Sequence, residues 1–183
     1  MSRDGRAPQP LVADDVEQGA ATWAPDGAQL VFGDVPEVFG VPDGNEVVHL
    51  YDLSSQRSSS LPDSGGLWTS RWSPSGRYVA ALTTRGQQLR IFEFATKRWR
   101  SLGADHVNNP TWSSDERYIY YDTEGSVAAL RRVRVADGAI EQLVDMNLYP
   151  ARPTQWSTVT QDGSPVVMQL IPAQVYALEL ERR

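Results

Sequence analysis

Four tryptophans lie in closely matching stretches of this 183-residue chain, and their recurrence limits the possible fold more than any other feature. They are Trp23, Trp72, Trp112 and Trp156, and successive ones are separated by 49, 40 and 44 residues. Periods of about 20–50 residues are typical of chains built from repeated supersecondary units. The sequence therefore predicts a repeat protein in which each unit is one small group of strands.

Each tryptophan precedes a polar turn, and an apolar run with β-favouring side chains follows that turn. In the first two units the turn contains Gly27 or Gly76, which tolerates the left-handed backbone of a tight reversal, whereas the third unit has Asp115-Glu116. In the fourth unit Asp162-Gly163 comes three residues later than in the first, which we interpret as an insertion. The apolar runs cover residues 29–32, 77–82, 117–121 and 166–168.

A second, alternating strand and a short outer strand complete the units. Alternation with period two predicts half-buried strands over residues 46–53, 88–94, 130–135 and 174–180. Outer strands that end in leucine are predicted over residues 57–61, 98–102 and 140–143. The fourth unit lacks one, but Leu11 stands twelve residues before Trp23, where an outer strand belongs. We therefore predict that residues 10–13 supply the closing strand of the last unit.

The repeat resembles that of TolB-type β-propellers, which reads roughly Trp-Ser-Pro-Asp-Gly followed by an apolar strand. Residues 72–76, Trp-Ser-Pro-Ser-Gly, match it best, and Ala24, Ser75, Ser114 and Glu116 depart from it. The resemblance implies an all-β fold, a β-propeller of four four-stranded antiparallel blades. The last unit is also similar to the closing segment of bacterial multidomain proteins that carry such a propeller behind a winged-helix regulator or a kinase domain.

We expect a disordered tail over residues 1–7 and one propeller domain over residues 8–183. The expected blades cover approximately residues 20–61, 69–102, 109–143 and 153–181, with the closing strand at 10–13. The resemblance implies a ring of six or more blades, as in TolB-type propellers. Four blades would therefore form half of an eight-bladed ring. The chain is therefore expected to be a homodimer. A closed four-bladed monomer and a fragment of a longer gene product are the alternatives.

Composition and charge argue against several classes of protein. The chain has no cysteine, so it can form neither disulfides nor thiolate metal sites. Its net charge of −6 disfavours nucleic-acid binding, and we interpret Arg131, Arg132 and Arg134 as charges that protect strands from pairing with other molecules. The chain starts with charged residues and has no long apolar run, so we predict no signal peptide and no membrane span. We therefore expect a cytoplasmic location.

The sequence gives no sign of catalytic chemistry. It contains no Gly-x-Ser-x-Gly nucleophile motif, no phosphate-binding glycine loop and no calcium-binding loop. Its two histidines, His49 and His106, have no second histidine at a metal-binding spacing. We therefore expect no catalytic residues, no metal, no cofactor and no enzyme activity.

The recurring tryptophans are interpreted as core residues that fill the space between neighbouring blades. Binding is expected instead on the face where the loops before the inner strands gather, together with the long loop over residues 33–45. The candidate contacts, chosen by position and chemistry, are Phe39, Trp68, Arg71, His106, Asn108, Asn109, Tyr149 and Arg152. Two functions stay open: an interaction module that binds a protein or peptide on one face, and a sensory or accessory propeller with a small ligand in its central channel.

Overall fold

The computed structural model describes residues 11–12, 18–35, 44–85, 87–148, 154–160, 164–169 and 175–177. These residues form antiparallel sheets in which neighbouring strands follow one another along the chain. The first sheet contains β1 (Gln18–Trp23), β2 (Gln29–Asp34), β3 (Val48–Asp52) and β4 (Arg57–Ser60). The second contains β5 (Leu67–Trp72), β6 (Tyr78–Thr83), β7 (Leu89–Glu93) and β8 (Arg98–Ser101).

The third sheet contains β9 (Asn108–Trp112), β10 (Tyr118–Thr123), β11 (Ala129–Arg134) and β12 (Ile140–Asp145). Two short 3₁₀ segments, η1 (Gly125–Val127) and η2 (Met146–Leu148), flank its outer strands. The last sheet contains β13 (Thr154–Val159), β14 (Pro165–Gln169) and β15 (Val175–Ala177). The described part of the chain contains no helix with the length and apolar content that a bilayer crossing requires.

The prediction of four four-stranded blades is confirmed only for the first three sheets. The described residues give the last sheet three strands, so it does not show the four strands that were expected. Of the predicted closing strand at residues 10–13, the structure describes Leu11 and Val12, and neither lies in a strand. Val12 packs instead on the first sheet, against Leu30, Phe32 and Tyr51. An apolar side chain is more stable on that apolar face than exposed to water.

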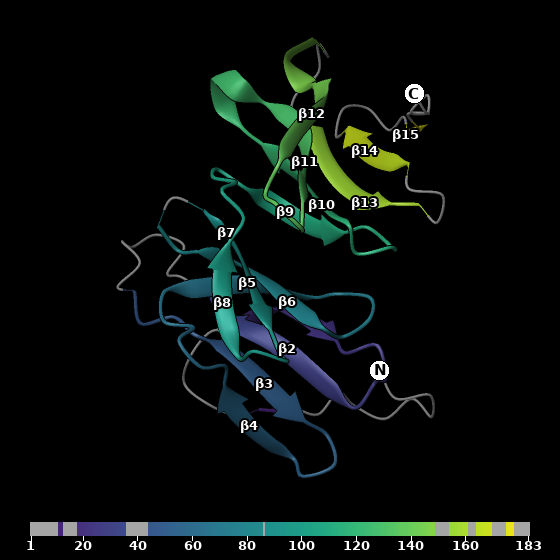
Figure 1. Cartoon of the computed structure of the whole chain (residues 1–183). Helices are drawn as coiled ribbons and strands as arrows, with labels where there is room; N and C mark the ends of the chain where they lie inside the picture. The colour runs from purple at the N-terminus through teal and green to yellow at the C-terminus, as the bar shows by residue number, and fades with distance from the viewer. Residues whose placement is uncertain are drawn as a thin grey trace.

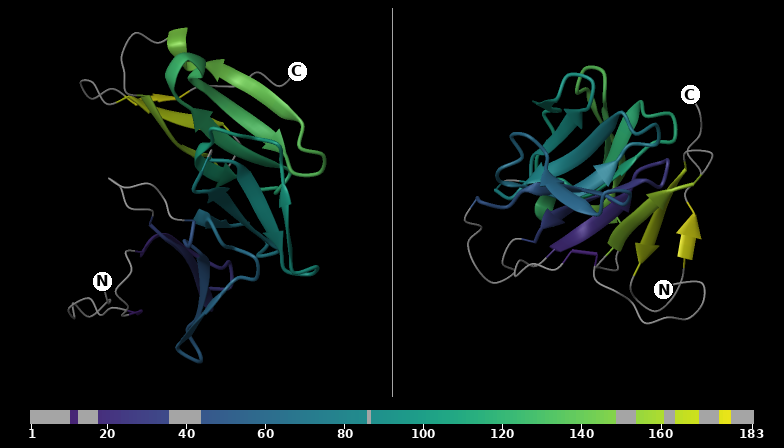
Figure 2. Two further views of the ribbon diagram at one scale, coloured as in Figure 1. Left: turned by 90° about the vertical axis from the view of Figure 1, so that its left-hand side faces the viewer. Right: turned by 90° about the horizontal axis from the view of Figure 1, so that it is seen from below.

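The sheets follow one another in chain order from one end of the molecule to the other, so that the first sheet and β13–β15 lie far apart (Figures 1 and 2). Apolar side chains fill the spaces between successive sheets. Between the first and second sheets lie Val31, Val48, Leu67, Val79 and Phe92. Between the second and third lie Leu82, Ile91, Val107, Ile119 and Tyr121.

The inner strands of the first three sheets share a β-bulge near their starts. The register with the second strand shifts between Gly19 and Thr22, between Trp68 and Arg71, and opposite Tyr120 and Asp122. At each shift one non-glycine residue has a left-handed backbone: Ala20 (φ 55°), Thr69 (φ 53°) and Asn109 (φ 48°). A bulge bends its strand and releases backbone groups from the ladder. Three sheets therefore present released backbone groups at the same level of the inner strands.

Candidate functional site

A pocket of about 350 Å³ opens where the inner strands of the first three sheets end. Its volume falls within the range of about 300–1,000 Å³ that is usual for ligand sites. Its walls come from matching positions in the repeat, from the residue just before the recurring tryptophan to the second residue after it. The lining residues are Trp23, Pro25, Arg71, Trp72, Ser73, Pro74, Thr111 and Trp112. The repeat thus brings equivalent segments of three sheets to one place.

Arg71 is the one charged residue in this lining, and the bulges hold it in position. Its Nη1 donates to the backbone oxygen of Ser70 at 2.9 Å and to that of Ala20 at 3.3 Å. Both carbonyls belong to bulge residues, one in β5 and the other in β1 of the neighbouring sheet. The guanidinium therefore bridges the first two sheets, and its orientation is fixed from both sides.

The rest of the guanidinium is available to a ligand. Arginine carries five N–H donors, and the two carbonyls engage only Nη1. Among the described residues, Nε and Nη2 have no hydrogen-bond partner. Neither is among the buried polar atoms without a partner, so both are accessible to solvent. No carboxylate in that part of the chain forms an ion pair with Arg71. Burial lowers the pKa of Arg71, because the charged form is partly removed from water.

The three tryptophans of the pocket have the same place in the repeat but different surroundings. Trp112 is buried, stacks at 5.9 Å on Tyr78 of the second sheet, and donates its Nε1 to the Arg71 oxygen at 3.1 Å. Trp72 is half-buried and stacks on Phe94 at 4.8 Å. Trp23 is 55% exposed. The prediction that these rings are core residues is confirmed for Trp112 and wrong for Trp23, since more than half of the Trp23 side chain is exposed.

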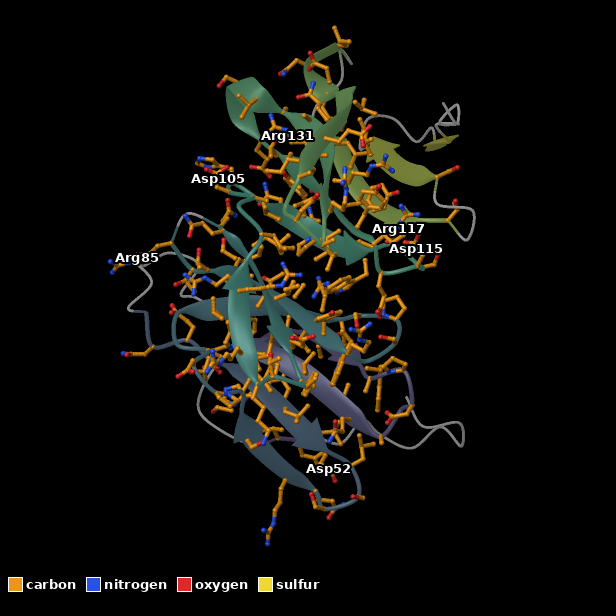
Figure 3. All side chains as sticks on the ribbon, viewed as in Figure 1. Asp52, Arg85, Asp105, Asp115, Arg117 and Arg131 are labelled. Atoms are coloured by element: carbon orange, nitrogen blue, oxygen red, sulfur yellow. The ribbon has the colours of Figure 1, made fainter. Side chains whose placement is uncertain are left out.

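Other candidate residues lie at the opposite ends of the inner strands. Figure 3 shows these two ends for β9, with Asp105 near its start and Asp115 in the turn that follows it. His106 and Asn109 are exposed near the start of β9, and Asn108 accepts a 2.9 Å hydrogen bond from Gln87. Trp68 is half-buried and packs on the core between the second and third sheets. Phe39, Tyr149 and Arg152 lie outside the described residues.

The structure thus places Arg71 in the pocket and leaves Trp68, His106, Asn108 and Asn109 away from it. Sequence reasoning missed the other lining residues because it assigned the tryptophans to the core. The repeat itself carried the signal, since matching positions of successive blades converge at the inner strand ends. Arg71 also stands out because its equivalents, Thr22 and Thr111, are neutral.

The histidine of the first sheet, His49, pairs with an aspartate and stacks on a ring of the same sheet. His49 Nε2 lies 2.8 Å from Asp34 Oδ1, and its ring stacks on Phe32 at a centroid distance of 5.0 Å. Asp34 also accepts a hydrogen bond from the Val47 backbone at 3.0 Å. The pair closes the end of the β2–β3 hairpin. Within the described residues, no group of three or more His, Cys, Asp or Glu side chains could hold a metal ion.

Comparison with known proteins gives no matching family model and no matching curated protein, but solved structures share the fold. TolB from Acinetobacter baumannii superposes with a TM-score of 0.69 over 96% of this chain and 47% of TolB, at 13% identity. The propeller domain of the trilobed protease from Pyrococcus furiosus gives 0.64 over 91% of this chain and 56% of that domain, at 12% identity. An oligogalacturonate lyase gives 0.61 over 85% and 48%, at 17% identity.

The fold is therefore a TolB-like β-propeller, as the resemblance of the repeat implied. The chain spans about half the length of these three proteins. The matched structures include enzymes, among them the lyase and a puromycin hydrolase, of which the chain covers 30%. At such low identity the likeness describes the arrangement of strands, and function has to be argued from the site.

Proposed function

We propose that this chain is a non-catalytic interaction module that binds a peptide segment of a partner protein in the pocket between its first three sheets. The observation that carries the proposal is the exposed ring of Trp23 beside the guanidinium of Arg71 in one pocket. Aromatic and arginine side chains contribute most of the binding energy at protein interfaces. The pocket offers both on a rigid frame of strands.

The chemistry of the lining fits recognition better than catalysis. The lining residues supply rings, prolines, one guanidinium and the hydroxyls of Ser73 and Thr111. The Ser73 hydroxyl is engaged, since it accepts a hydrogen bond from the Tyr78 backbone at 3.1 Å. A general base would have to be within hydrogen-bond reach of a reacting proton. The lining residues that the structure describes include no His, Asp, Glu, Lys or Cys to act as one.

A screen on an array of random hexapeptides tests the proposal. Peptides that bind the parent chain are synthesised with a fluorescent label, and their affinities are measured by fluorescence polarisation. Trp23→Ala is expected to weaken binding at least fivefold, because it removes the exposed ring of the pocket. The control is Leu148→Ala, which shortens a 77% exposed apolar side chain in η2, outside the pocket. If no peptide shows binding that depends on Trp23, the proposal is wrong and a small ligand in the central channel becomes the favoured function.

A further inference from the structure

The free edge of the Arg71 guanidinium specifies the kind of peptide that the pocket selects. Because Nη1 is held by the oxygens of Ala20 and Ser70, Nε and one hydrogen of Nη2 remain side by side on the other edge. Two parallel N–H groups of this kind match the two oxygens of a carboxylate. The arginine is therefore oriented in advance for a bidentate contact.

The surroundings of this edge favour a carboxylate over a phosphate. Arg71 is the single cation among the lining residues, and the rest of the wall is aromatic, proline or hydroxyl. Phosphate groups carry about −1.5 to −2 charges and are usually recognised by clusters of arginines. A single guanidinium balances one negative charge, as on a carboxylate. The net charge of −6 further disfavours a group with two negative charges.

The apolar wall provides the second half of the specificity. Trp23 exposes 55% of its surface, and Pro25 and Pro74 lie with it in the lining. Rigid rings of this type bury an apolar side chain at little cost in conformational entropy. A ligand that carries a carboxylate next to an apolar residue would satisfy both parts of the pocket at once.

We propose that the pocket binds a carboxylate of its peptide ligand through Nε and Nη2 of Arg71, while a neighbouring apolar side chain packs on Trp23. This proposal rests on the proposed function. The carboxylate can come from the C-terminus of the peptide or from an Asp or Glu side chain. The two sources present the same chemistry to Arg71 and are separated by experiment.

The test uses random hexapeptides attached through their N-termini and synthesised in three forms. One form has a free C-terminal carboxylate and no acidic side chain, the second has a C-terminal carboxamide and no acidic residue, and the third has a carboxamide and one internal Asp or Glu. The full chain is expected to bind the first or the third form at least tenfold more tightly than the second. The form that gains affinity identifies the source of the carboxylate.

Variants of the chain then link this preference to Arg71. In Arg71→Met the affinity for the acidic peptide is expected to fall at least tenfold, to the level of its carboxamide analogue. Arg71→Lys keeps the charge without the fork and is expected to fall between the two. Arg57→Met, on the exposed outer strand β4, makes the same chemical change away from the pocket and is expected to leave the preference unchanged. Thermal melts of each variant show whether the fold is retained.

The possible results distinguish a failure of the carboxylate proposal from a failure of the proposed peptide-binding function. Equal affinity for acidic and amidated peptides, with both weakened by Trp23→Ala, would overturn the carboxylate proposal and leave the peptide-binding function standing. A preference for acidic peptides that survives in a folded Arg71→Met would also overturn it. If no form of any peptide binds, both proposals fall together.

Discussion

Ser75 and Glu116 join the turns of the second and third sheets. The Ser75 hydroxyl donates to Glu116 Oε2 at 2.8 Å, and the Ser75 backbone N–H donates to Oε1 at 2.5 Å. Glu116 has a left-handed backbone (φ 58°) at the place where the other two turns have Gly27 and Gly76. A side chain is costly in that conformation. The contact with Ser75 offsets part of this cost and links two adjacent sheets.

Glu116→Gln is expected to lower stability by about 0.5–1 kcal/mol at pH 7, because a charge-assisted contact at the surface is weakened. Burial raises the pKa of Glu116, but the hydrogen bonds from Ser75, together with Ser73 and the charge of Arg77, outweigh it and hold the pKa below the usual 4.5. The contribution of the carboxylate is therefore complete above pH 4.5 and is lost as the pH falls through the lowered pKa. Urea unfolding at pH 7 and pH 3 checks this, and an equal difference at both pH values would contradict it.

Trp112→Phe is expected to cost roughly 1 kcal/mol more than Trp72→Phe, although the chemical change is the same. The Nε1 of Trp112 donates to the Arg71 oxygen at 3.1 Å, whereas the buried Nε1 of Trp72 has no partner. Only the first substitution removes a hydrogen bond from a part-buried carbonyl. Chemical denaturation of the two variants measures the difference, and equal losses would show that the indole hydrogen bond contributes little.

Asp122→Asn is expected to remove a pH dependence from the stability of the chain. Asp122 is buried, and burial raises its pKa, with a smaller effect in the same direction from Glu124. A carboxyl whose pKa is raised by folding binds its proton more tightly in the folded state. Stability is therefore lost as the pH rises from the usual 3.8 through the raised pKa.

The amide of Asp122→Asn keeps an oxygen for Asn109, whose Nδ2 donates to Asp122 Oδ1 at 3.1 Å. The variant is expected to be more stable than the parent near pH 7, by up to about 1.4 kcal/mol for each unit of pKa shift. This advantage should shrink towards pH 3. Thermal melts across this range test the prediction, which would be wrong if the two chains kept a constant difference.

Val12→Asp is expected to destabilise the chain by about 1–2 kcal/mol, because it brings a charge onto the apolar face formed by Leu30, Phe32 and Tyr51. Leu11→Asp is the matched control, since Leu11 is 55% exposed, and it should stay within about 0.5 kcal/mol of the parent. Urea denaturation compares the two. Similar stabilities would show that the packing of Val12 contributes little.

The dimer that the repeat count suggested stays a prediction. The chain spans about half the length of related propellers, and Trp23 is exposed where a preceding blade would stand in a longer ring. Light scattering on the purified chain is expected to give a mass near twice 20.3 kDa. A mass near 20.3 kDa that persists at high concentration would contradict it.

The repeat pattern predicted the fold well because each unit carries its own strand and turn signals. Gly27 and Gly76 mark turns whose backbone needs them, and the runs after them became β2 and β6. The bulges could not be predicted in the same way. Ala20 and Thr69 have left-handed backbones, although their residue types have no special preference for that conformation and so give no sign of a bulge. Because the bulges position Arg71, the pocket could not be predicted from the strand pattern either.

Side chains of a strand alternate between its two faces, and the extra residue of a bulge reverses that alternation for everything after it. The bulge at Thr69 and Ser70 therefore decides which way Arg71 and Trp72 point. Without the extra residue, Arg71 and Trp72 could keep their pairing with Ala80 and Val79 only if Leu67 and Trp68 reversed their directions. A single deletion that leaves every lining residue in the sequence would thus reverse either the core side chains before the bulge or the pocket side chains after it, because the number of residues along β5 is as much a part of the site as Arg71 itself.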